Sequence, residues 1–408
     1  MTLWIIIRNS LRQHALSTGI TAVSIGLAMG LFMAIWTVKE QSMAAFTNVT
    51  GGFDAVMGSR GSELSLVLFS VFHMDKAPGT LPPETLDELT APKLKGQPNP
   101  NRRFIKRAVP LVVGDNHQDF RIVGTTREFF EVPYRDQQRH ALRPKGRLFG
   151  EQAQEAVLGS YVADRLGMKV GQTFRPMPGI NYNQEAEIHP VDYLVVGILE
   201  PSNTPADRAI WIPMKGAQNM PGHRYEARQE ISAILLQLTG LGPIFVDGVN
   251  KGTRDKTVAL IAPTVTRFFQ RFEWVGVVLG GMAALVALVG AGAIMASLHN
   301  TMNERRREIA ILRSLGARRG TVFSVIVLES MAISALGVLM GAAIYVGLML
   351  TSVHFIHEYT GVVIRPWETS PVMLGAPLGV LALGALAGLL PAAKAYRTDV
   401  ASHLIPQS

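Results

Sequence analysis

Four long stretches of the chain are apolar and uncharged, without the alternation of polar and apolar positions that marks a half-exposed helix or strand. They are Ala15 to Val38, Trp274 to Leu298, Ser330 to Val353 and Pro371 to Ala393. Each is long enough to cross the hydrocarbon core of a bilayer, which takes roughly 20 residues at about 1.5 Å of rise per residue. The pattern predicts four membrane-spanning helices. Their Gly and Ala residues favour close packing of helix on helix.

The first apolar stretch follows Arg8 and Arg12, as the core of a secretory signal would. Its 24 uncharged residues exceed the usual signal core of roughly 7 to 15 residues, so a retained anchor is expected. Before it, Trp4, Ile7 and Leu11 share one side of a predicted helix. This helix either lies in the membrane interface or is an ordinary basic flank of the span.

The segment from Lys39 to Glu273 has the pattern of a folded α+β domain. Short runs rich in β-forming residues alternate with turn signals: "AVPLVVGD", "DFRIVGTT", "EAVLGS", "VDYLVVGILE", "RAIWIPM" and "EISAILLQL". Helices are predicted at "PPETLDELT" and at "SYVADRLG", with Ser160 as N-cap and Gly167 as the stop. "LSLVLFSVF" is too short to span a membrane and is expected to be a buried or amphipathic part of this domain. "APKLKGQPNPNRR" is expected to be an exposed loop.

The distribution of Lys and Arg predicts the topology. The segment from His299 to Gly320 carries six arginines, whereas the segment from His354 to Ser370 carries only Arg365. Because cytoplasmic loops are enriched in Lys and Arg, both termini and the arginine-rich segment are predicted to be cytoplasmic. The large domain is then on the outer face of the membrane.

Composition narrows the range of functions. The chain has 408 residues, 48% of them hydrophobic, a net charge of +8 and no cysteine. Much of the basic clustering flanks the spans, where it sets topology and meets anionic lipid, so nucleic acid is not expected as a partner. The lack of cysteine excludes thiol catalysis and cysteine-bound metals.

Catalytic motifs are not found. The sequence has no phosphate-binding G-x-x-x-x-G-K-[ST] loop, no H-E-x-x-H and no G-x-S-x-G. The glycine-rich "MGSRGSELS" lacks the P-loop lysine and is expected to be a turn. No enzyme activity and no cofactor are therefore predicted in this chain.

Two histidine groups and one acidic residue within an apolar stretch are candidate sites. His354, His357 and Glu358 have helical spacing, and His73 lies near Asp75, but clusters this small more often mark membrane edges or ordinary turns, so no metal site is predicted. Glu329 stands near the start of the third span. An ionisable residue there is a functional candidate, and the alternative is that it reaches the interface or pairs with an arginine of the preceding segment.

The arginine-rich segment, "NERRREIAILRSLGARRGTVF" at 303 to 323, is predicted to contain a helix of its own. Asn303 or an earlier polar residue is the expected cap, Glu304 and Glu308 suit the N-terminal end, and Gly316 is the expected stop. Ile309, Leu312 and Leu315 form a narrow apolar stripe at three-residue spacing. A charged helix with an apolar edge, tied at both ends to spans, is suited to transmit force from a docked partner; the alternative is a plain loop that sets topology.

At this segment the sequence resembles the FtsX/MacB-type (type VII, LolC/E-like) permease subunits of ABC transporters, through "NERRREIAILRSLGARRGTVFSVIVLESM". The stretches "EAVLGSYVADRLGMKVGQTF" and "YLVVGILEPSNTPADRAIWIP" are similar to the periplasmic core domain of the same family. The resemblance covers most of the chain, including the order of the spans.

The resemblance implies a layout and a mechanism. The implied segments are 1–14, an interfacial helix; 15–38, the first span; 39–273, the periplasmic core domain; 274–298, the second span; 299–320, the coupling helix; 321–353, the third span; 354–370, a periplasmic loop; 371–393, the fourth span; and 394–408, a cytoplasmic tail. The coupling helix would sit on a separate ATPase dimer, which binds ATP and Mg. The implied contacts are Asn303, Glu304, Arg305, Arg306, Arg307, Glu308, Leu312, Arg313, Leu315, Gly316 and Ala317.

Two classes of function follow from the resemblance. In the first, ATP-driven motion of the periplasmic domain exports or extracts a lipoprotein, peptide, lipid or drug, or supports metal uptake. In the second, the motion signals to a periplasmic enzyme such as a cell-wall hydrolase, without transport. Either implies a bacterial inner-membrane protein with a second permease copy or paralogue, lipid contacts and a possible periplasmic partner.

Overall fold

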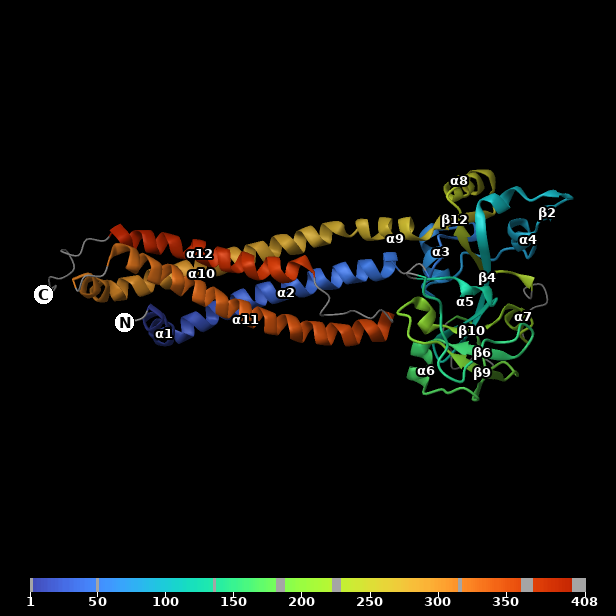
Figure 1. Cartoon of the computed structure of the whole chain (residues 1–408), viewed down its shortest axis with the longest axis horizontal. Coiled ribbons are helices and arrows are strands. Elements are labelled where there is room, and N and C mark those ends of the chain that lie inside the picture. Colours follow the sequence, from blue (N-terminus) through green and yellow to red (C-terminus); the bar gives the residue numbers. More distant parts are fainter. Residues whose placement is uncertain are drawn as a thin grey trace. The chain divides into compact units, whose positions relative to one another are not determined.

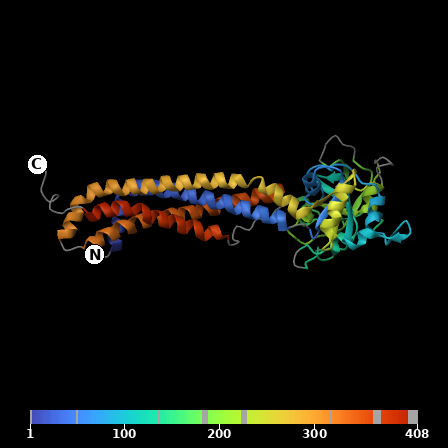
Figure 2. The ribbon, with the colours of Figure 1, turned by 90° about the horizontal axis from the view of Figure 1, so that it is seen from above.

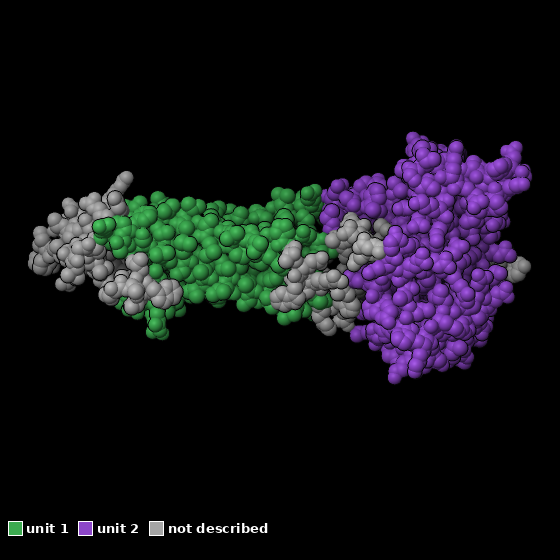
Figure 3. Space-filling model, viewed as in Figure 1, with its two compact units in different colours: residues 1–41, 272–355, 364–408 green, residues 42–271, 356–363 purple. Residues whose placement is uncertain are grey.

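The chain divides into two compact units. The computed structural model describes residues 3–48, 51–134, 137–180, 188–221, 229–314, 318–360 and 370–397. Unit 1 comprises residues 1–41, 272–355 and 364–408, and unit 2 comprises residues 42–271 and 356–363 (Figure 3). The prediction of an α+β domain inserted after the first of four apolar helices is confirmed.

Unit 1 is helical in its described part. Its helices are α1 (Leu3–Gln13), α2 (Ala15–Asn48), α10 (Glu273–Ser314), α11 (Arg319–Thr360) and α12 (Pro371–Arg397). The four longer helices run side by side in both Figure 1 and Figure 2. Their segments that are long and apolar enough to cross a membrane are Ala15–Gln41, Glu273–Ala296, Gly320–Val353 and Pro371–Ala393.

The predicted N-terminal helix is present as α1. A single turn residue, His14, separates it from α2. The His14 amide donates to the Ser10 carbonyl at 3.1 Å, and the His14 carbonyl accepts from Thr18 at 2.9 Å, so the backbone hydrogen bonds continue through the turn. Its position in a membrane interface remains a prediction.

Helices α2 and α11 approach each other closely through two pairs of glycines. Gly26 and Gly30 of α2 face Gly337 and Gly341 of α11. A Cβ added at Gly30 would lie only 2.7 Å from the Gly341 carbonyl oxygen, and one at Gly26 only 2.9 Å from the Cβ of Met340. Glycines at four-residue spacing let transmembrane backbones pack this closely, where dispersion forces have to replace the hydrophobic effect.

Helix α11 also packs against α12, one to two turns earlier along the same face, and here serines meet glycines. Ser330 and Ser334 of α11 are both fully buried, and a Cβ added at Gly384 or Gly388 of α12 would overlap their hydroxyl groups. The hydroxyls are satisfied within α11, since Ser330 Oγ donates to Val327 O at 2.7 Å and Ser334 Oγ to Ser330 O at 3.0 Å. Helix α11 therefore packs against both α2 and α12.

Unit 2 is built on a ten-stranded sheet with the order β12-β1-β11-β4-β5-β10-β6-β9-β7, and β8 pairs with β4. The strands are β1 (Ala55–Ser59), β4 (Ile105–His117), β5 (Phe120–Thr125), β6 (Glu155–Leu158), β7 (Thr173–Phe174), β8 (Met177–Pro178), β9 (Tyr193–Ile198), β10 (Ile210–Pro213), β11 (Ala233–Leu238) and β12 (Lys256–Leu260). The six predicted runs form β4, β5, β6, β9, β10 and β11. Strands β1 and β12 were not predicted.

The 13-residue strand β4 joins two halves of this sheet. Its first half pairs antiparallel with β11, and its second half pairs antiparallel with β5 after a register shift between Val113 and Asp115. Beyond β5 the sheet is mixed, because β10 runs parallel to β5 and β9 parallel to β6. Strand β4 thus links an antiparallel half to a mixed half.

Short helices cover the sheet. They are α3 (Glu63–Ser70), α4 (Glu84–Thr90), α5 (Glu128–Glu131), α6 (Ser160–Leu166), α7 (Met214–Gln218), α8 (Gly242–Gly252) and α9 (Ile261–Gln270), with 3₁₀ turns η1 (Pro100–Arg103) and η2 (Pro205–Arg208). Helix α3 buries Leu66, Val67 and Phe69, which confirms that "LSLVLFSVF" belongs to the domain core. Helix α4 follows Pro83 as expected.

Three local predictions need correction. Gly159, not Ser160, is the N-cap of α6. Helix η2 passes close to this position, so a Cβ at Gly159 would overlap the Asp207 carbonyl. The predicted turn at "MGSRGSELS" begins within strand β1, which runs to Ser59. The expected loop "APKLKGQPNPNRR" contains the hairpin β2 (Lys93–Leu94) and β3 (Gln97–Pro98), turned by Lys95 and Gly96 at positive φ. Gly167 does end α6 in the left-handed conformation, as predicted.

The segment "EPSNTPADRAIWIP" is held in place by buried hydrogen bonds. The buried Asp207 carboxylate accepts hydrogen bonds from the backbone amides of Ser202 and Asn203 and from Ser202 Oγ at 2.8 Å. Burial raises the pKa of Asp207 despite these bonds. The Trp211 indole donates to Ala206 O at 3.1 Å, which fixes η2 against β10. The segment therefore acts as a folding element rather than as a reactive site.

We predict that Gly30→Ala destabilises unit 1 by about 1–3 kcal/mol, because its methyl group would collide with backbone of α11. The matched control is Gly19→Ala on the same helix, where a Cβ meets nothing within 4 Å. This control should be neutral or stabilising by up to about 1 kcal/mol from helix propensity. Unfolding in mixed detergent micelles measures both, and equal stabilities for the two variants would contradict the close approach.

Candidate functional site

The arginine-rich segment continues the second span without interruption. Helix α10 runs for 42 residues, from Glu273 to Ser314. The prediction that a separate helix begins at Asn303 is wrong, because Asn303 lies inside α10. No Gly or Pro occurs between Ile294 and Ser314, so nothing in the sequence interrupts the helical hydrogen bonds there.

Because α10 is continuous, its charged part beyond Ala296, up to Ser314, is a helical extension of the span, here called the lever. The span within α10 ends at Ala296, which leaves 18 helical residues, about 27 Å of helix, beyond it. Arg305, Arg306 and Arg307 lie on this extension. A force applied to the extension therefore acts directly on the end of a membrane span.

The predicted ATPase contacts are only partly described. Those on α10 are Asn303, Glu304, Arg305, Arg306, Arg307, Glu308, Leu312 and Arg313. The structure gives their helical positions but does not describe their side chains. The other three, Leu315, Gly316 and Ala317, lie outside the described residues. Contact of this segment with an ATPase therefore remains a prediction.

Glu329 is the second element of the site, and its carboxylate is buried within the bundle. The residue is 6% exposed, and its Oε1 accepts a hydrogen bond from the hydroxyl of Ser10, itself 1% exposed. One partner of this carboxylate is therefore a serine of α1, and its functional role remains a prediction. The bond joins α1 to α11, ten residues from the beginning of α11.

A second polar contact lies at the other end of the α2 span. Ser370 Oγ donates to Glu40 Oε2 at 2.6 Å, joining α2 to the residue before α12. A hydrogen bond to a charged acceptor contributes more than a neutral one. The bundle is thus tied by a polar contact near each end, with glycine packing between them.

Sequence reasoning missed most of these partners. The four-residue spacing of Gly26 and Gly30, and of Gly337 and Gly341, was a usable signal for close packing. Nothing local in the sequence points from Ser10 to Glu329, which lie 319 residues apart. The pairing depends on the tertiary arrangement alone.

The histidine candidates do not form a metal site in the part of the chain that the structure describes. The side chains of His354, His357 and Glu358 lie outside that part. Asp75 directs its carboxylate to Ser65 Oγ at 2.7 Å and to the Lys76 amide at 2.8 Å, and these hydrogen bonds lower its pKa. The Asp75 carboxylate therefore stabilises a turn by these hydrogen bonds and is not a ligand shared with His73.

His73 instead belongs to a row of contacting rings with His140, three pairs of which are stacked and one of which, His73 on Trp211, is edge-on. The row runs Tyr134, His140, Phe129, Trp211 and His73, with neighbouring ring centroids 4.2 to 5.5 Å apart. His140 Nδ1 and Nε2 and His73 Nδ1 are buried without a hydrogen-bond partner in the structure. Burial lowers the pKa of His73 to about 3, with help from the nearby Arg121, and that of His140 to about 4. Both rings are neutral at physiological pH.

Comparison with known families agrees with this architecture. Residues 15–242 match the MacB-like periplasmic core domain, and residues 280–400 match the FtsX-like permease C-terminal domain. Together the two matches include the first, third and fourth spans, most of the second, and the sheet domain up to residue 242. The chain belongs to the MacB/FtsX family of ABC transporter permeases.

Among curated relatives, the chain is 24% identical over 413 residues to the macrolide export ATP-binding/permease protein MacB of Nitrosomonas europaea, covering 95% of this chain and 56% of that protein. It is 33% identical over 123 residues to the uncharacterized ABC transporter permease YknZ of Bacillus subtilis, covering 30% and 29%. It is 27% identical over 179 residues to the pyoverdine export ATP-binding/permease protein PvdT of Pseudomonas fluorescens, covering 44% and 24%. The chain thus spans at most 56% of the length of these three relatives.

We predict that Ser10→Ala destabilises unit 1 by about 1.5–3 kcal/mol, because it removes a hydrogen bond to a buried carboxylate. The control is Ser24→Ala, which loses only an exposed bond to Ile20 O in its own helix. Unfolding in mixed micelles gives both values. A Ser10→Ala protein as stable as the Ser24→Ala control would show that the contact does not hold α1.

Acid should weaken unit 2 through the two buried histidines. Their pKa values in the folded state lie below the value of about 6.5 expected when unfolded, so the unfolded state binds more protons as the pH falls. The contribution is fully present above about pH 6.5 and is lost progressively below it, by about 2 kcal/mol for each histidine between pH 6.5 and 5.

Hydrogen exchange of β5 and β10 in the full chain, corrected for the intrinsic pH dependence, measures this loss. His140→Phe keeps a ring between Tyr134 and Phe129 but cannot be protonated. It should reduce the acid-dependent loss by about half, in line with one histidine of two. An unchanged pH dependence in this variant would exclude His140 as a contributor.

Proposed function

We propose that this chain couples ATP hydrolysis by a separate ABC ATPase to motion of its periplasmic-type domain. The unbroken helix α10 carries the proposal: its arginine-rich extension and its membrane span form one 42-residue rod. A rigid rod transmits a displacement that a hinged loop would absorb. The ATPase would be a dimer that supplies the ATP and Mg sites.

The packing of α10 supports this role. Half of the residues in the most apolar window of α2 are buried, compared with 12% in α10, the lowest share of the four spans. Helix α10 packs on α12 but leaves the largest share of its apolar window exposed by its own chain. Helix α11 packs against α2 through the glycine pairs and against α12 through the serine–glycine contacts described above.

The orientation follows from charge. The extension of α10 carries Arg305, Arg306, Arg307 and Arg313, and such a cluster next to a span favours the cytoplasm. Both termini would share that side, and unit 2 would be periplasmic in a bacterial inner membrane. A second copy or a paralogue would complete a membrane unit of eight spans, because four are few for a transport route.

The coupled motion would export or extract a lipoprotein, peptide, lipid or drug, or support metal uptake. Two relatives are named for export of macrolide and of pyoverdine, which supports an export reading. Signalling to a periplasmic enzyme uses the same lever without cargo. The observations favour no single cargo within these classes.

The test is to break the lever. Ala310→Pro would remove a helical hydrogen bond and clash with the preceding turn of α10, at a cost of about 3 kcal/mol or more, whereas Ala310→Ser leaves the helix intact. The full chain, purified from native membranes with whatever ATPase accompanies it, is compared with and without ATP by hydrogen exchange of unit 2.

The native chain and Ala310→Ser should bring down an ATPase and show an ATP-dependent change in unit 2 exchange. Ala310→Pro should lose at least about 90% of that change, as expected when the rod is severed. If no ATPase accompanies the native chain, or if Ala310→Pro responds like Ala310→Ser, the proposal is wrong.

A further inference from the structure

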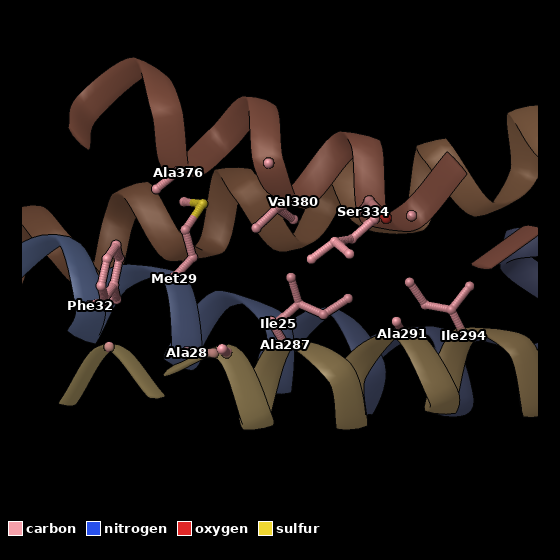
Figure 4. Close-up of a pocket in the computed structure, with 15 residues that line it drawn as sticks. Ile25, Ala28, Met29, Phe32, Ala287, Ala291, Ile294, Ser334, Ala376 and Val380 are labelled. Atoms are coloured by element: carbon pink, nitrogen blue, oxygen red, sulfur yellow. The ribbon is translucent and has the colours of Figure 1, made fainter. Parts of the chain in front are cut away.

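Unit 1, which carries the four spans, contains a cavity of about 240 Å³ that its own side chains leave unfilled. Figure 4 shows its wall, with Ile25, Met29 and Phe32 on α2 facing Val380 and Ala376 on α12. Ala287, Ala291 and Ile294 of α10 line the adjoining side, and Ser334 of α11 lies at one end. All four spans contribute, and every lining residue belongs to unit 1.

Small residues on α10 and α12 create this space. The α10 wall is made of Gly280, Ala284, Ala287 and Ala291 before it reaches Ile294. A Cβ added at Gly280, or at Gly379 of α12, would meet nothing within 4 Å, unlike the glycines that pack α2 on α11. Gly280 and Gly379 thus make no close helix contact of their own and line an opening.

Water does not suit this cavity. A buried water needs two to four polar partners, and an apolar cavity of this size remains dry. Ser334 carries the only side-chain hydroxyl in the lining, and it already donates to Ser330 O at 3.0 Å. The lining offers no charged side chain either.

The cavity opens where hydrocarbon lies outside. Ala284 and Gly379 are lining residues that are exposed on the surface of the unit. Ala284 lies in the middle of the span Glu273–Ala296, and Gly379 lies eight residues into the span Pro371–Ala393. A lipid tail at this depth has direct access, whereas a polar headgroup would remain nearer the interface.

We propose that one acyl chain of a bilayer phospholipid occupies this cavity as a resident part of the bundle. The chain replaces the dispersion contacts that the small residues of α10 and α12 cannot make. Because the lining is apolar and uncharged, it recognises the tail and not the headgroup. The inference rests on the cavity alone and does not depend on the proposed coupling to an ATPase.

Native mass spectrometry of the full chain in detergent tests the proposal. The variant Ala287→Leu/Ala376→Leu adds bulk from α10 and from α12 into the cavity. The control is Ala382→Leu, an exposed alanine of α12 that does not line the cavity. The native chain and the control should each retain one phospholipid, and the double variant should lose at least about 90% of it, because its side chains take the same space.

Thermal unfolding tests the same proposal in solution, so its result does not depend on the lipid staying bound in the gas phase. Added phosphatidylglycerol and phosphatidylcholine of equal chain length should stabilise the delipidated native chain equally, and the double variant should gain less than half as much. Equal lipid retention by all three proteins overturns the proposal. So does a headgroup-selective effect, or a double variant that loses a chain–chain dimer instead of a lipid, since the occupant would then be a second copy.

Discussion

Helices α2 and α11 can touch backbone to backbone only because neither carries a side chain at the crossing. Gly26 and Gly30 meet Gly337 and Gly341, and one added methyl at Gly30 would lie within 2.7 Å of a backbone oxygen. In a bilayer, lipid tails compete equally for apolar surface, so close contact of this kind is what holds helices together. The same face of α11 also packs against α12, through Ser330 and Ser334 nearer its N-terminal end.

This arrangement gives the bundle a firm part and a loose part. Helix α11 fixes α2 and α12, and Glu329 ties α1 to the same helix through Ser10. Helix α10 is the least buried span and borders the apolar cavity. It is also the helix with the long arginine-rich extension, so the proposed coupling would act on the span whose apolar window is least buried.

Much of the architecture could be predicted from sequence because strong physical constraints leave a local signature. A span must be apolar for about 20 residues, which is why all four were found. Strands such as β9 and β11 carry runs of Val, Ile and Leu. The two missed strands have a weaker pattern, since β1 reads AVMGS and β12 begins with a lysine and a threonine, KTVAL.

The errors have a common cause. Asn303 has the chemistry of an N-cap, but a cap forms only where the preceding residue leaves the helix, and the spans on its N-terminal side keep α10 helical. Ser10 and Glu329 meet because the bundle brings distant residues together, which no local pattern records. The buried histidines likewise acquire their neutral character from burial that only the fold creates.

The central claim is that α10 moves while α2 and α11 stay together. The chain has no cysteine, so spin labels can be placed at exposed positions without background: Leu285 on α10, Leu27 on α2 and Leu339 on α11. Double electron–electron resonance would be recorded on the Leu285/Leu339 and Leu27/Leu339 cysteine pairs, in the complex with the co-purified ATPase, with and without a non-hydrolysable ATP analogue. The account predicts that the first distance shifts and the second does not. A shift in the second distance, or in neither, would contradict it.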